Sequence, residues 1–318
     1  MAGLSRDPAE VFEAAQGGHR LGLARLMSMV ERGGDDARVL GALTFPQAGS
    51  AHTVGITGAP GSGKSTLTSA LTAVVRGAGE RMAVLAVDPS SPFTGGAILG
   101  DRVRMQDHVM DEDVYIRSMA TRGHLGGLSL ATPQAVRVLD ALGWPWVLVE
   151  TVGVGQVEVE IAGAADTTVV VVNPGWGDSV QANKAGLMEI ADIFVINKSE
   201  RAGADDTRRD IQQMLELSSL GSWEPPIVMT VGTTGAGTEE LWAETARHRE
   251  HITASGELER RRSARLETEL QEILHRSIEA RVALIAGGDD FGPLRDEVLA
   301  RMIDPYAAVS KLLDSIEL

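Results

Sequence analysis

The chain has 318 residues, of which 43% are hydrophobic and 23% are charged, which is ordinary for a globular protein with a substantial core. It contains no cysteine, which excludes disulfides, thiolate metal sites and cysteine nucleophiles and favours a cytoplasmic location. The net charge of −15 argues against a nucleic-acid partner, because phosphate backbones are bound by clustered Lys and Arg. No apolar run approaches the roughly 20 residues of a membrane span, and the acidic start of the chain resembles neither a secretory signal nor a transit peptide.

Residues 1–48 are predicted to form a helical extension. Apolar side chains recur along one helical face of this region, and Gly33 and Gly34 end the segment. The apolar positions are Leu21, Leu23, Leu26, Met27 and Val30.

Residues 49–252 alternate between short apolar runs and helical segments. Continuous apolar runs of this kind are typical of parallel strands covered on both faces, so we expect an α/β domain with a mainly parallel, doubly wound sheet. The predicted strands are Thr53–Thr57, Met82–Val87, Val114–Ile116, Trp146–Val149, Thr168–Val172, Ile193–Ile196 and Ile227–Val231.

Residues 253–318 are predicted to form a separate helical region. It begins with a charged helix, Glu257–Val282, and ends with a helical piece around Tyr306–Leu313. The charged stripe Glu257–Arg265 is interpreted as a solvated or dimer-facing helix surface rather than a specific docking site.

The strand Thr53–Thr57 and the predicted helix Leu67–Val75 enclose a segment that matches the phosphate-binding pattern G-x-x-x-x-G-K-[ST]. We call this segment the P-loop; its residues are Gly58, Ala59, Pro60, Gly61, Ser62, Gly63, Lys64, Ser65 and Thr66. We expect its backbone N–H groups and the helix N-terminus to converge on one phosphate chain, Lys64 to reach the β- and γ-phosphates, and the Ser65 hydroxyl to bind Mg²⁺. A glycine turn with a chance lysine is the alternative, and the strand–loop–helix order argues against it. The sequence therefore predicts a nucleoside triphosphate site.

Asp88 ends the strand Met82–Val87 and opens a polar segment that contains Asp101 and Arg104. A carboxylate at the carboxyl end of a strand lies beside the P-loop of a doubly wound sheet, where Mg²⁺ needs oxygen ligands. Asp88 and Asp101 are therefore candidates for the metal or its waters, and Arg104 for the γ-phosphate. A surface loop with capping aspartates explains the same residues equally well.

Glu150 ends the strand Trp146–Val149 and is a second acidic candidate, suited to hold a Mg²⁺ water. Gly153 lacks a side chain and can approach the γ-phosphate closely. Because that contact would disappear on hydrolysis, residues 150–160 are predicted to form a nucleotide-sensing switch. Gln156 is a weaker candidate for orienting the attacking water.

Asn197-Lys198-Ser199-Glu200 follows the strand Ile193–Ile196 and resembles the guanine-reading pattern Asn-Lys-x-Asp, with Glu in place of Asp. A carboxylate accepts hydrogen bonds from guanine N1–H and the 2-amino group, whereas adenine N1 is itself an acceptor. The three residues Val231, Gly232 and Thr233 then fall where a second base-contacting loop belongs. In isolation, a helix-capping Asn-Lys pair would be just as plausible.

Together these motifs resemble the MeaB-type (also ArgK- or MMAA-type) G-protein chaperones of adenosylcobalamin-dependent acyl-CoA mutases, over nearly the whole chain. The matching stretches are the P-loop, 88–92 with 95–96 and 98–102, 150–156, 173–178, Gln181, 184–186 and 189–198. The resemblance implies a SIMIBI-class P-loop GTPase that binds Mg²⁺ and GTP or GDP and forms a homodimer through its C-terminal helices. Its GTP cycle is expected to gate adenosylcobalamin delivery to methylmalonyl-CoA mutase or a close relative and to protect that enzyme.

The resemblance also implies that the segment 173–186 is a third switch at the partner surface. Asp178, Gln181 and Lys184 are then candidates for coupling mutase binding to hydrolysis. A flexible connection is the alternative interpretation of this glycine-rich segment.

Some motifs of related functions are absent from the sequence. We find no Asp-x-His-x-x-Gly pattern of the kind that ligates cobalamin, so the cofactor is expected to reside in the partner. No Cys or His cluster indicates nickel insertion; His248 and His251 lie at i, i+3 and are interpreted as part of a solvated helix. A small-molecule kinase or transport ATPase is the alternative function, but it needs a substrate pocket and an adenine-compatible site, and we identify neither.

Overall fold

The computed structural model describes residues 5–88, 108, 110–120, 131–151, 157–175, 186, 189–217, 221–288 and 291–314; the side chains of Asp88, Ala120 and residues 157–160 are outside this description. The chain forms two compact units, residues 1–262 and 263–318. The three-part division at residues 48/49 and 252/253 stays a prediction. No helix in the described ranges has the length and apolar character needed to cross a bilayer.

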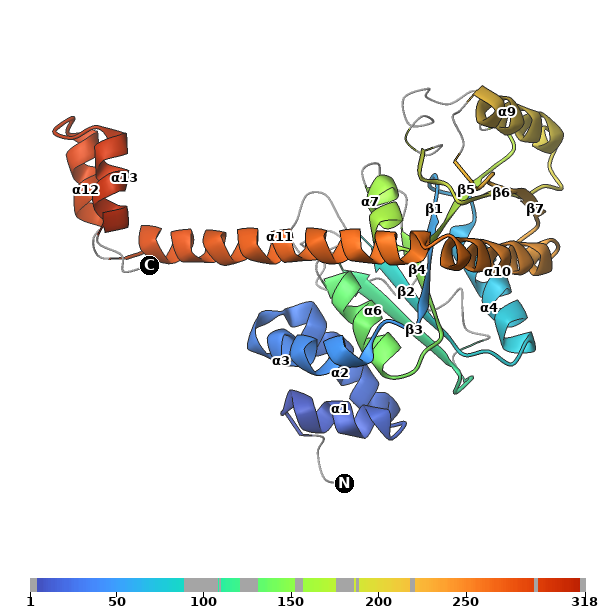
Figure 1. The fold of residues 1–318 in the computed structure, drawn as a ribbon, viewed down its shortest axis with the longest axis horizontal. Coiled ribbons are helices and arrows are strands. Elements are labelled where there is room, and N and C mark those ends of the chain that lie inside the picture. The colour runs from blue at the N-terminus through green and yellow to red at the C-terminus, as the bar shows by residue number, and fades with distance from the viewer. Residues whose placement is uncertain are drawn as a thin grey trace. The chain divides into compact units, whose positions relative to one another are not determined.

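In the described part of the first unit, seven strands form a parallel sheet, which confirms the α/β, doubly wound prediction (Figure 1). The strand order is β3-β2-β4-β1-β5-β6-β7, so β1 lies at the centre between β4 and β5. The strands are β1 (His52–Thr57), β2 (Met82–Asp88), β3 (Val114–Ala120), β4 (Trp146–Thr151), β5 (Thr167–Val172), β6 (Ile193–Asn197) and β7 (Ile227–Thr230). Every residue of β1, β4, β5 and β6 is buried, as expected for continuous apolar runs covered on both faces.

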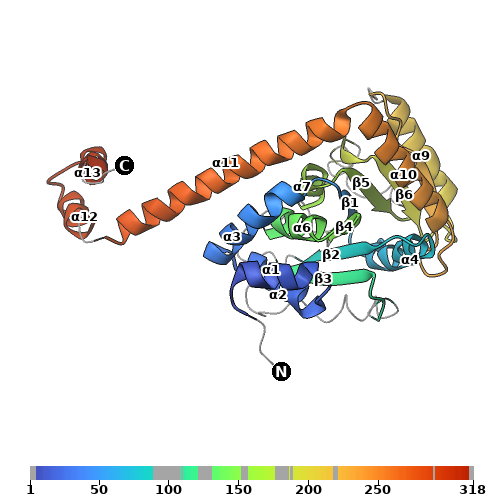
Figure 2. The same ribbon diagram turned by 60° about the horizontal axis from the view of Figure 1, so that its bottom comes forward.

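Helices cover both faces of this sheet (Figure 2). On one face, α4 (Lys64–Gly77) and α10 (Thr238–Ala254) contribute Leu67, Leu71 and Leu241 to a core with alternate strand residues such as Val169. On the opposite face lie α6 (Ala131–Ala141), α7 (Val157–Ala164) and α9 (Ala204–Leu217), which pack against the intervening strand residues. Because successive residues of a strand point to opposite faces of the sheet, each buried strand contributes side chains to the cores on both faces.

The N-terminal extension is helical, as predicted, and folds as three helices: α1 (Pro8–Gln16), α2 (Arg20–Arg32) and α3 (Gly34–Thr44), with the short turn η1 (Phe45–Gln47). Leu23, Leu26, Met27 and Val30 are buried, whereas Leu21 is exposed, so the predicted apolar face excludes Leu21. Leu21 lies in the first turn of α2, on the side away from α6 and the sheet edge. The Arg20 guanidinium donates to the Val114 carbonyl at 2.9 Å, which joins α2 to the edge strand β3.

The C-terminal helices partly match the prediction. α11 (Glu257–Ala286) begins in the first unit and continues into the second, and α13 (Pro305–Asp314) corresponds to the predicted final piece. The helix α12 (Phe291–Leu299) lies between them and was not predicted.

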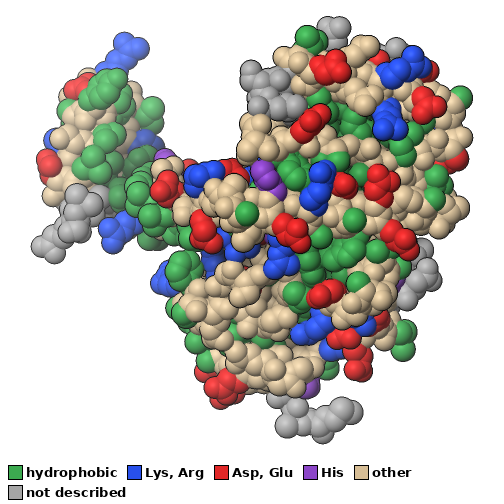
Figure 3. Space-filling model, turned by 45° about the vertical axis from the view of Figure 1, so that its right-hand side comes forward, with side chains coloured by type: hydrophobic (Ala, Val, Ile, Leu, Met, Phe, Trp, Pro, Cys, Tyr) green, Lys and Arg blue, Asp and Glu red, His purple; other side chains and the backbone are tan. Residues whose placement is uncertain are grey.

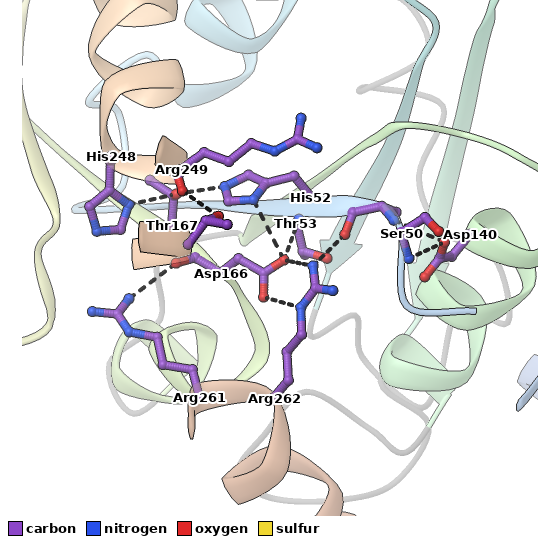
Figure 4. Close-up of polar contacts among 12 residues, drawn as sticks. Ser50, His52, Thr53, Asp140, Asp166, Thr167, His248, Arg249, Arg261 and Arg262 are labelled. Atoms are coloured by element: carbon purple, nitrogen blue, oxygen red, sulfur yellow. Dashed lines mark hydrogen bonds and ion pairs between the residues drawn. The ribbon is translucent and has the colours of Figure 1, made fainter. Parts of the chain in front are cut away.

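A polar network joins the amino ends of the central strands to the start of α11 (Figure 4). Asp166 precedes β5 and accepts a hydrogen bond from the Thr53 backbone N–H at 3.0 Å. Arg262 donates to the Asp166 carboxylate at 2.9 Å and to the Ala51 carbonyl at 2.7 Å. The neighbouring Arg261 holds Asp192 with two hydrogen bonds of 2.9 Å. The interpretation of the stripe Glu257–Arg265 as solvated or dimer-facing is therefore wrong for Arg261 and Arg262.

The same network contains two buried histidines. The Thr167 hydroxyl lies 2.8 Å from His52 Nε2 and 2.8 Å from His248 Nδ1 (Figure 4). The other ring nitrogen of His248 lies 3.2 Å from Asp192. The prediction that His248 belongs to a solvated helix face is therefore wrong, because this side of α10 packs on the sheet.

Candidate nucleotide site

The P-loop connects the carboxyl end of β1 to the N-terminus of α4, in the strand–loop–helix order that the sequence predicts. Gly58 has φ +134°, and a Cβ there would lie 2.0 Å from the Val171 carbonyl oxygen. Gly63 has φ +91°, and a Cβ there would lie 2.4 Å from the Asn197 side-chain nitrogen. Only glycine fits these two positions, because the backbone is left-handed and the neighbouring atoms leave no space. The loop therefore packs directly against the carboxyl ends of β5 and β6.

Three side chains at the carboxyl ends of β5 and β6 donate to carbonyl oxygens of the P-loop. Lys198 Nζ donates to the Gly61 oxygen at 2.6 Å and Asn173 Nδ2 donates to the same oxygen at 3.3 Å. Asn197 Nδ2 donates to the next carbonyl, that of Ser62, at 2.8 Å. The Ser62 N–H, which follows the Gly61 carbonyl, donates to the Ala59 oxygen at 3.1 Å inside the loop. In a trans peptide the C=O and the following N–H point in opposite directions, so the Gly63 N–H points away from the Ser62 carbonyl that Asn197 holds. A loop of backbone N–H groups held in one conformation in this way suits an anion.

Lys64 is the first residue of α4 and is only 6% exposed. Its ammonium donates to the Gly58 oxygen at 2.6 Å and the Ala59 oxygen at 3.1 Å, so it lies folded back over the P-loop. This cation, the positive end of the helix dipole and the first-turn amides converge on one location. The arrangement suits a phosphate group.

The next residue, Ser65, faces β4, the strand that pairs with β1 on the side opposite β5. Its hydroxyl donates to Glu150 Oε1 at 2.6 Å, and Glu150 is 4% exposed near the end of β4. The pairing of Ile56 with Glu150 across β1 and β4 explains why two residues 85 positions apart meet here. A hydroxyl and a carboxylate are both oxygen ligands of the kind that Mg²⁺ prefers, so these two residues fit a Mg²⁺ site. In the described ranges no group of three or more His, Asp or Glu side chains could hold a metal ion.

Asn197 also joins the P-loop to the second predicted base-contacting loop. Its Oδ1 accepts hydrogen bonds from the Gly232 N–H at 3.0 Å and the Thr230 hydroxyl at 3.2 Å. Lys198 has φ +58°, a left-handed conformation that non-glycine residues rarely adopt and that accompanies its contact with the P-loop. The structure thus brings together Asn197, Lys198 and the loop that contains Val231, Gly232 and Thr233. Glu200 is exposed nearby in the chain.

Other predicted site residues lie outside the described part of the chain. They are Asp101, Arg104, Gly153, Gln156, Asp178, Gln181 and Lys184. Asp88 ends β2 and pairs with Ala120 of β3, but its side chain is not described. The roles of all these residues stay predictions.

Sequence reasoning placed Asn173 in the predicted switch segment 173–186 rather than beside the P-loop, and it did not single out Thr230. Asn173 directly follows β5, and Asn197 is the last residue of β6. This shared location at the carboxyl end of a buried strand was the signal that could have identified Asn173 as a site residue. Thr230 ends β7 and holds Asn197, a contact that only the sheet order reveals.

The sequence model of the family described as "Methylmalonyl Co-A mutase-associated GTPase MeaB" matches residues 23–286. A Pyrococcus horikoshii protein assigned as a GTPase is 48% identical over 312 residues, which cover 96% of this chain and 98% of that protein. The Escherichia coli GTPase ArgK is 37% identical over 79% of this chain and 78% of its own. The mouse protein named methylmalonic aciduria type A homolog, mitochondrial, is 37% identical over 66% of this chain and 52% of its own.

A solved structure named for a LAO/AO transport system kinase superposes with a TM-score of 0.68 at 25% sequence identity, with 96% of each chain covered. The alternative of a kinase or transport ATPase rests on the name of that structure alone, and the relatives named above as GTPases do not favour it. The family match covers most of the chain, including the P-loop, Glu150 and Asn197. The chain belongs to the MeaB family of methylmalonyl-CoA mutase-associated GTPases.

Proposed function

We propose that this chain binds Mg²⁺ and GTP on the P-loop, hydrolyses GTP slowly, and uses that cycle to control an acyl-CoA mutase in the cytoplasm. The partner would be methylmalonyl-CoA mutase or a close relative, and the controlled steps would be the loading of adenosylcobalamin and the protection of the loaded enzyme. The cobalamin would stay with the mutase. The observation that carries the proposal is the P-loop braced by Asn197 and Lys198, in a family described by its association with that mutase.

Each site residue has a role in this proposal. Lys64 would hold the β- and γ-phosphates, and Ser65 and Glu150 would hold Mg²⁺, with Asp88 and Asp101 completing its surroundings directly or through water. The bound Mg²⁺ would neutralise the charge that develops on the phosphates. Arg104 and Gly153 would face the γ-phosphate, and Gln156 would orient the attacking water.

A panel of nucleotides tests the binding step. We expect tight, Mg²⁺-dependent binding of GTP and GDP, weak binding of ATP, and loss of binding in Lys64→Ala. The lysine cation is the charge that the P-loop places on the phosphates, so near-normal GTP affinity in that variant would refute the assignment. Phosphorylated arginine or ornithine, formed at a rate comparable to GTP hydrolysis, would instead support the kinase alternative.

Coupling to the partner needs a separate test. We propose that Asp178, Gln181 and Lys184 transmit mutase binding to the site. Lys184→Ala should then reduce the stimulation of hydrolysis by the mutase while the P-loop still binds GTP. Equal stimulation of variant and parent would remove Lys184 from this role.

We also propose that the chain forms a homodimer through its C-terminal helices. The second unit exposes apolar side chains every four residues along α11, and further ones on α12, α13 and the turn between them (Figure 3). Those that recur at this spacing on α11 are Leu266, Leu270, Leu274, Ile278 and Val282, and Ile273 and Leu284 are exposed as well. A stripe of this length is stabilised by burial against another helix.

Light scattering after gel filtration tests the dimer. We expect the double variant Leu270→Glu/Leu274→Glu to run as a monomer, because two charges would enter the apolar stripe. Arg276→Glu/Ala283→Glu is the matched control, since both positions lie opposite Leu274, the middle of the stripe, on the helical wheel. A dimeric Leu270→Glu/Leu274→Glu variant would place the interface elsewhere.

A further inference from the structure

Two buried carboxylates, Asp166 before β5 and Asp192 before β6, are linked by side chains that meet at one hydroxyl. The Thr167 hydroxyl lies 2.8 Å from His52 Nε2 on one side and 2.8 Å from His248 Nδ1 on the other (Figure 4). The second nitrogen of each ring faces a carboxylate. His248 Nε2 lies 3.2 Å from Asp192, and His52 Nδ1 lies 3.8 Å from Asp166. We call these five residues the histidine network; both rings are at most 1% exposed, so contacts within the protein determine where their protons lie.

The hydroxyl sets the direction of the hydrogen bonds, because Thr167 has one hydrogen and can donate to only one ring. The other ring must donate to the Thr167 oxygen. His248 Nε2 is the ring nitrogen nearer to a carboxylate, so it carries a hydrogen, and its Nδ1 accepts from Thr167. His52 then donates from Nε2, which leaves a lone pair on His52 Nδ1. In the described part of the chain this nitrogen has no hydrogen-bond partner.

The histidine network therefore has one position open for a further proton, on His52 Nδ1 facing Asp166. Burial is the main reason why the pKa of His52 is lowered to about 3, and Asp166 opposes that shift only in part. The other charged or titratable groups that face His52 also oppose a proton there. They are Arg249 and His248 on α10, and Arg262 on α11.

Arg262 supplies the positive charge that this proton would otherwise bring to Asp166. Its guanidinium donates at 2.9 Å to Asp166 Oδ2, the same oxygen that faces His52 Nδ1. Arg262 also faces the carboxylates of Asp140 on α6 and Glu259 on α11, which favour its charged form. Because a buried carboxylate without a cation is costly, loss of the arginine makes a proton on His52 the available compensation.

The other end of the histidine network has no such open position. Arg261 holds Asp192 with two hydrogen bonds of 2.9 Å, and His248 Nε2 lies 3.2 Å from the same carboxylate. There the ring already directs a hydrogen toward the carboxylate. A proton can therefore be added only at the end where Arg262 binds.

We propose that Arg262 of α11 and a proton on His52 compete for one oxygen of Asp166, so that acidification loosens the start of α11 from the amino end of β5. When Arg262 leaves, the charge of Asp166 is no longer neutralised and water reaches the ring, and both changes raise the pKa of His52. The loosened form thus binds the proton at a higher pH than the docked form, and it is favoured as the pH falls below 6.5. The inference goes beyond the proposed function, because it uses no residue of the nucleotide site.

The titration of His52 in the full chain tests the competition. Its imidazole resonance, in protein with ¹³C-labelled histidine, is identified by its absence in His52→Gln. We expect the parent resonance to shift little above about pH 4, whereas Arg262→Gln should raise the pKa of His52 by about 1–3 and bring its titration into view. Arg260→Gln is the matched control, because it removes the same charge from the same turn of α11 at a position that is 68% exposed. Its His52 resonance should behave as in the parent.

Hydrogen exchange at the start of α11 tests the loosening itself. After correction for intrinsic exchange, the protection of the amides of residues 260–262 should fall by up to about 30-fold from about pH 8 to about pH 5. That factor is the proton linkage between a pKa of about 3 in the docked form and 6.5 in the loosened form. In His52→Gln the decrease should disappear, because glutamine takes up no proton. These amides should also be less protected than those of the core helix α4, since loosening does not require unfolding.

A raised pKa of His52 in Arg262→Gln, together with a loss of protection that depends on His52, supports the inference. An unchanged titration in Arg262→Gln would overturn it, and so would a loss of protection that persists in His52→Gln. Equal protection of α4 and the start of α11 would also overturn it, because only unfolding would then expose α11. If Arg262→Gln fails to fold, the exchange of the parent and of His52→Gln decides, since both retain the ion pair.

Discussion

Arg262 and Asp166 form an ion pair of 2.9 Å that connects α11 to the amino end of β5. Arg261 and Asp192 make the equivalent connection to the amino end of β6. The opposite ends of the same two strands carry Asn173 and Asn197, which bind the P-loop. At its amino end, each of these two strands therefore has a carboxylate that binds an arginine of α11. At its carboxyl end, each has an asparagine side chain that binds the P-loop.

The ion pair between Arg262 and Asp166 should contribute strongly to the stability of the first unit. Asp166 is 1% exposed, so Arg262→Ala leaves a buried carboxylate without its cation. We expect a loss of about 2–4 kcal/mol, somewhat less than for a fully enclosed pair because Arg262 is 20% exposed. Urea unfolding followed by tryptophan fluorescence measures this, since all five tryptophans precede residue 263.

A surface ion pair provides the control for that measurement. Arg209 and Asp206 are 68% and 72% exposed, so Arg209→Ala should change the free energy of unfolding by less than about 0.5 kcal/mol. Equal effects of Arg209→Ala and Arg262→Ala would show that the buried pair contributes no special stability.

The stability of the first unit should fall as the pH is lowered from about 6.5, because of His52. Burial lowers the pKa of His52 from 6.5 to about 3, and Asp166 opposes that shift only in part. Since the unfolded chain binds a proton that the folded chain excludes, stability is complete above pH 6.5 and is lost progressively toward pH 3. At pH 5 the loss relative to pH 8 is about 2 kcal/mol.

Unfolding in urea at several pH values, with His52→Gln as the comparison, tests this effect. Glutamine cannot take up a proton, so the slope between pH 6.5 and pH 5 should be reduced in the variant. Burial by itself would raise the pKa of Asp192, but His248 and Arg261 outweigh burial and hold that pKa below its usual value. The stability that Asp192 contributes is therefore lost only at a pH more acidic than the range measured for His52. An unchanged slope in His52→Gln would assign the pH dependence to other groups.

The sheet was predictable from the sequence because its central strands are continuous runs of apolar residues, such as Val169–Val172. The P-loop was predictable because its chemistry depends on nine consecutive residues. By contrast, α12 contains Gly292 and Pro293 and has no buried residue, so neither propensity nor periodicity indicated a helix there.

Contacts between distant segments were not predictable in the same way. His248 looked solvated beside His251, and only the packing of α10 on β5 brings it to Thr167. Asn173 and Gly61 are 112 residues apart, and their contact follows from the placement of β5 next to β1. Local patterns therefore identified the residues of the P-loop, whereas strand order determines the residues that support the loop.

Glu150 should determine how much Mg²⁺ the hydrolysis reaction requires. Glu150→Gln keeps the size of the side chain that accepts from Ser65 but removes its charge. We expect the Mg²⁺ concentration for half-maximal GTP hydrolysis to rise about 10–100-fold. GDP affinity in the absence of Mg²⁺ should remain close to that of the parent. Glu80→Gln, on an exposed turn, removes the same charge elsewhere, and an equal shift in that control would argue against a specific role of Glu150.

Glu200 should set the preference for guanine, although it stands where the usual pattern has Asp. Its carboxylate is expected to accept from the 2-amino group of guanine, which inosine nucleotides lack. One hydrogen bond to a charged group corresponds to a preference for GTP over ITP of about tenfold or more. Glu200→Ala should reduce that ratio to about one to two, whereas Glu200→Asp should retain it. Competition binding with GTP, ITP and ATP measures the ratios, and ATP should remain weak for the parent because adenine N1 faces the carboxylate as a second acceptor. If Glu200→Ala discriminates between GTP and ITP as well as the parent does, the guanine-reading group lies elsewhere in the chain.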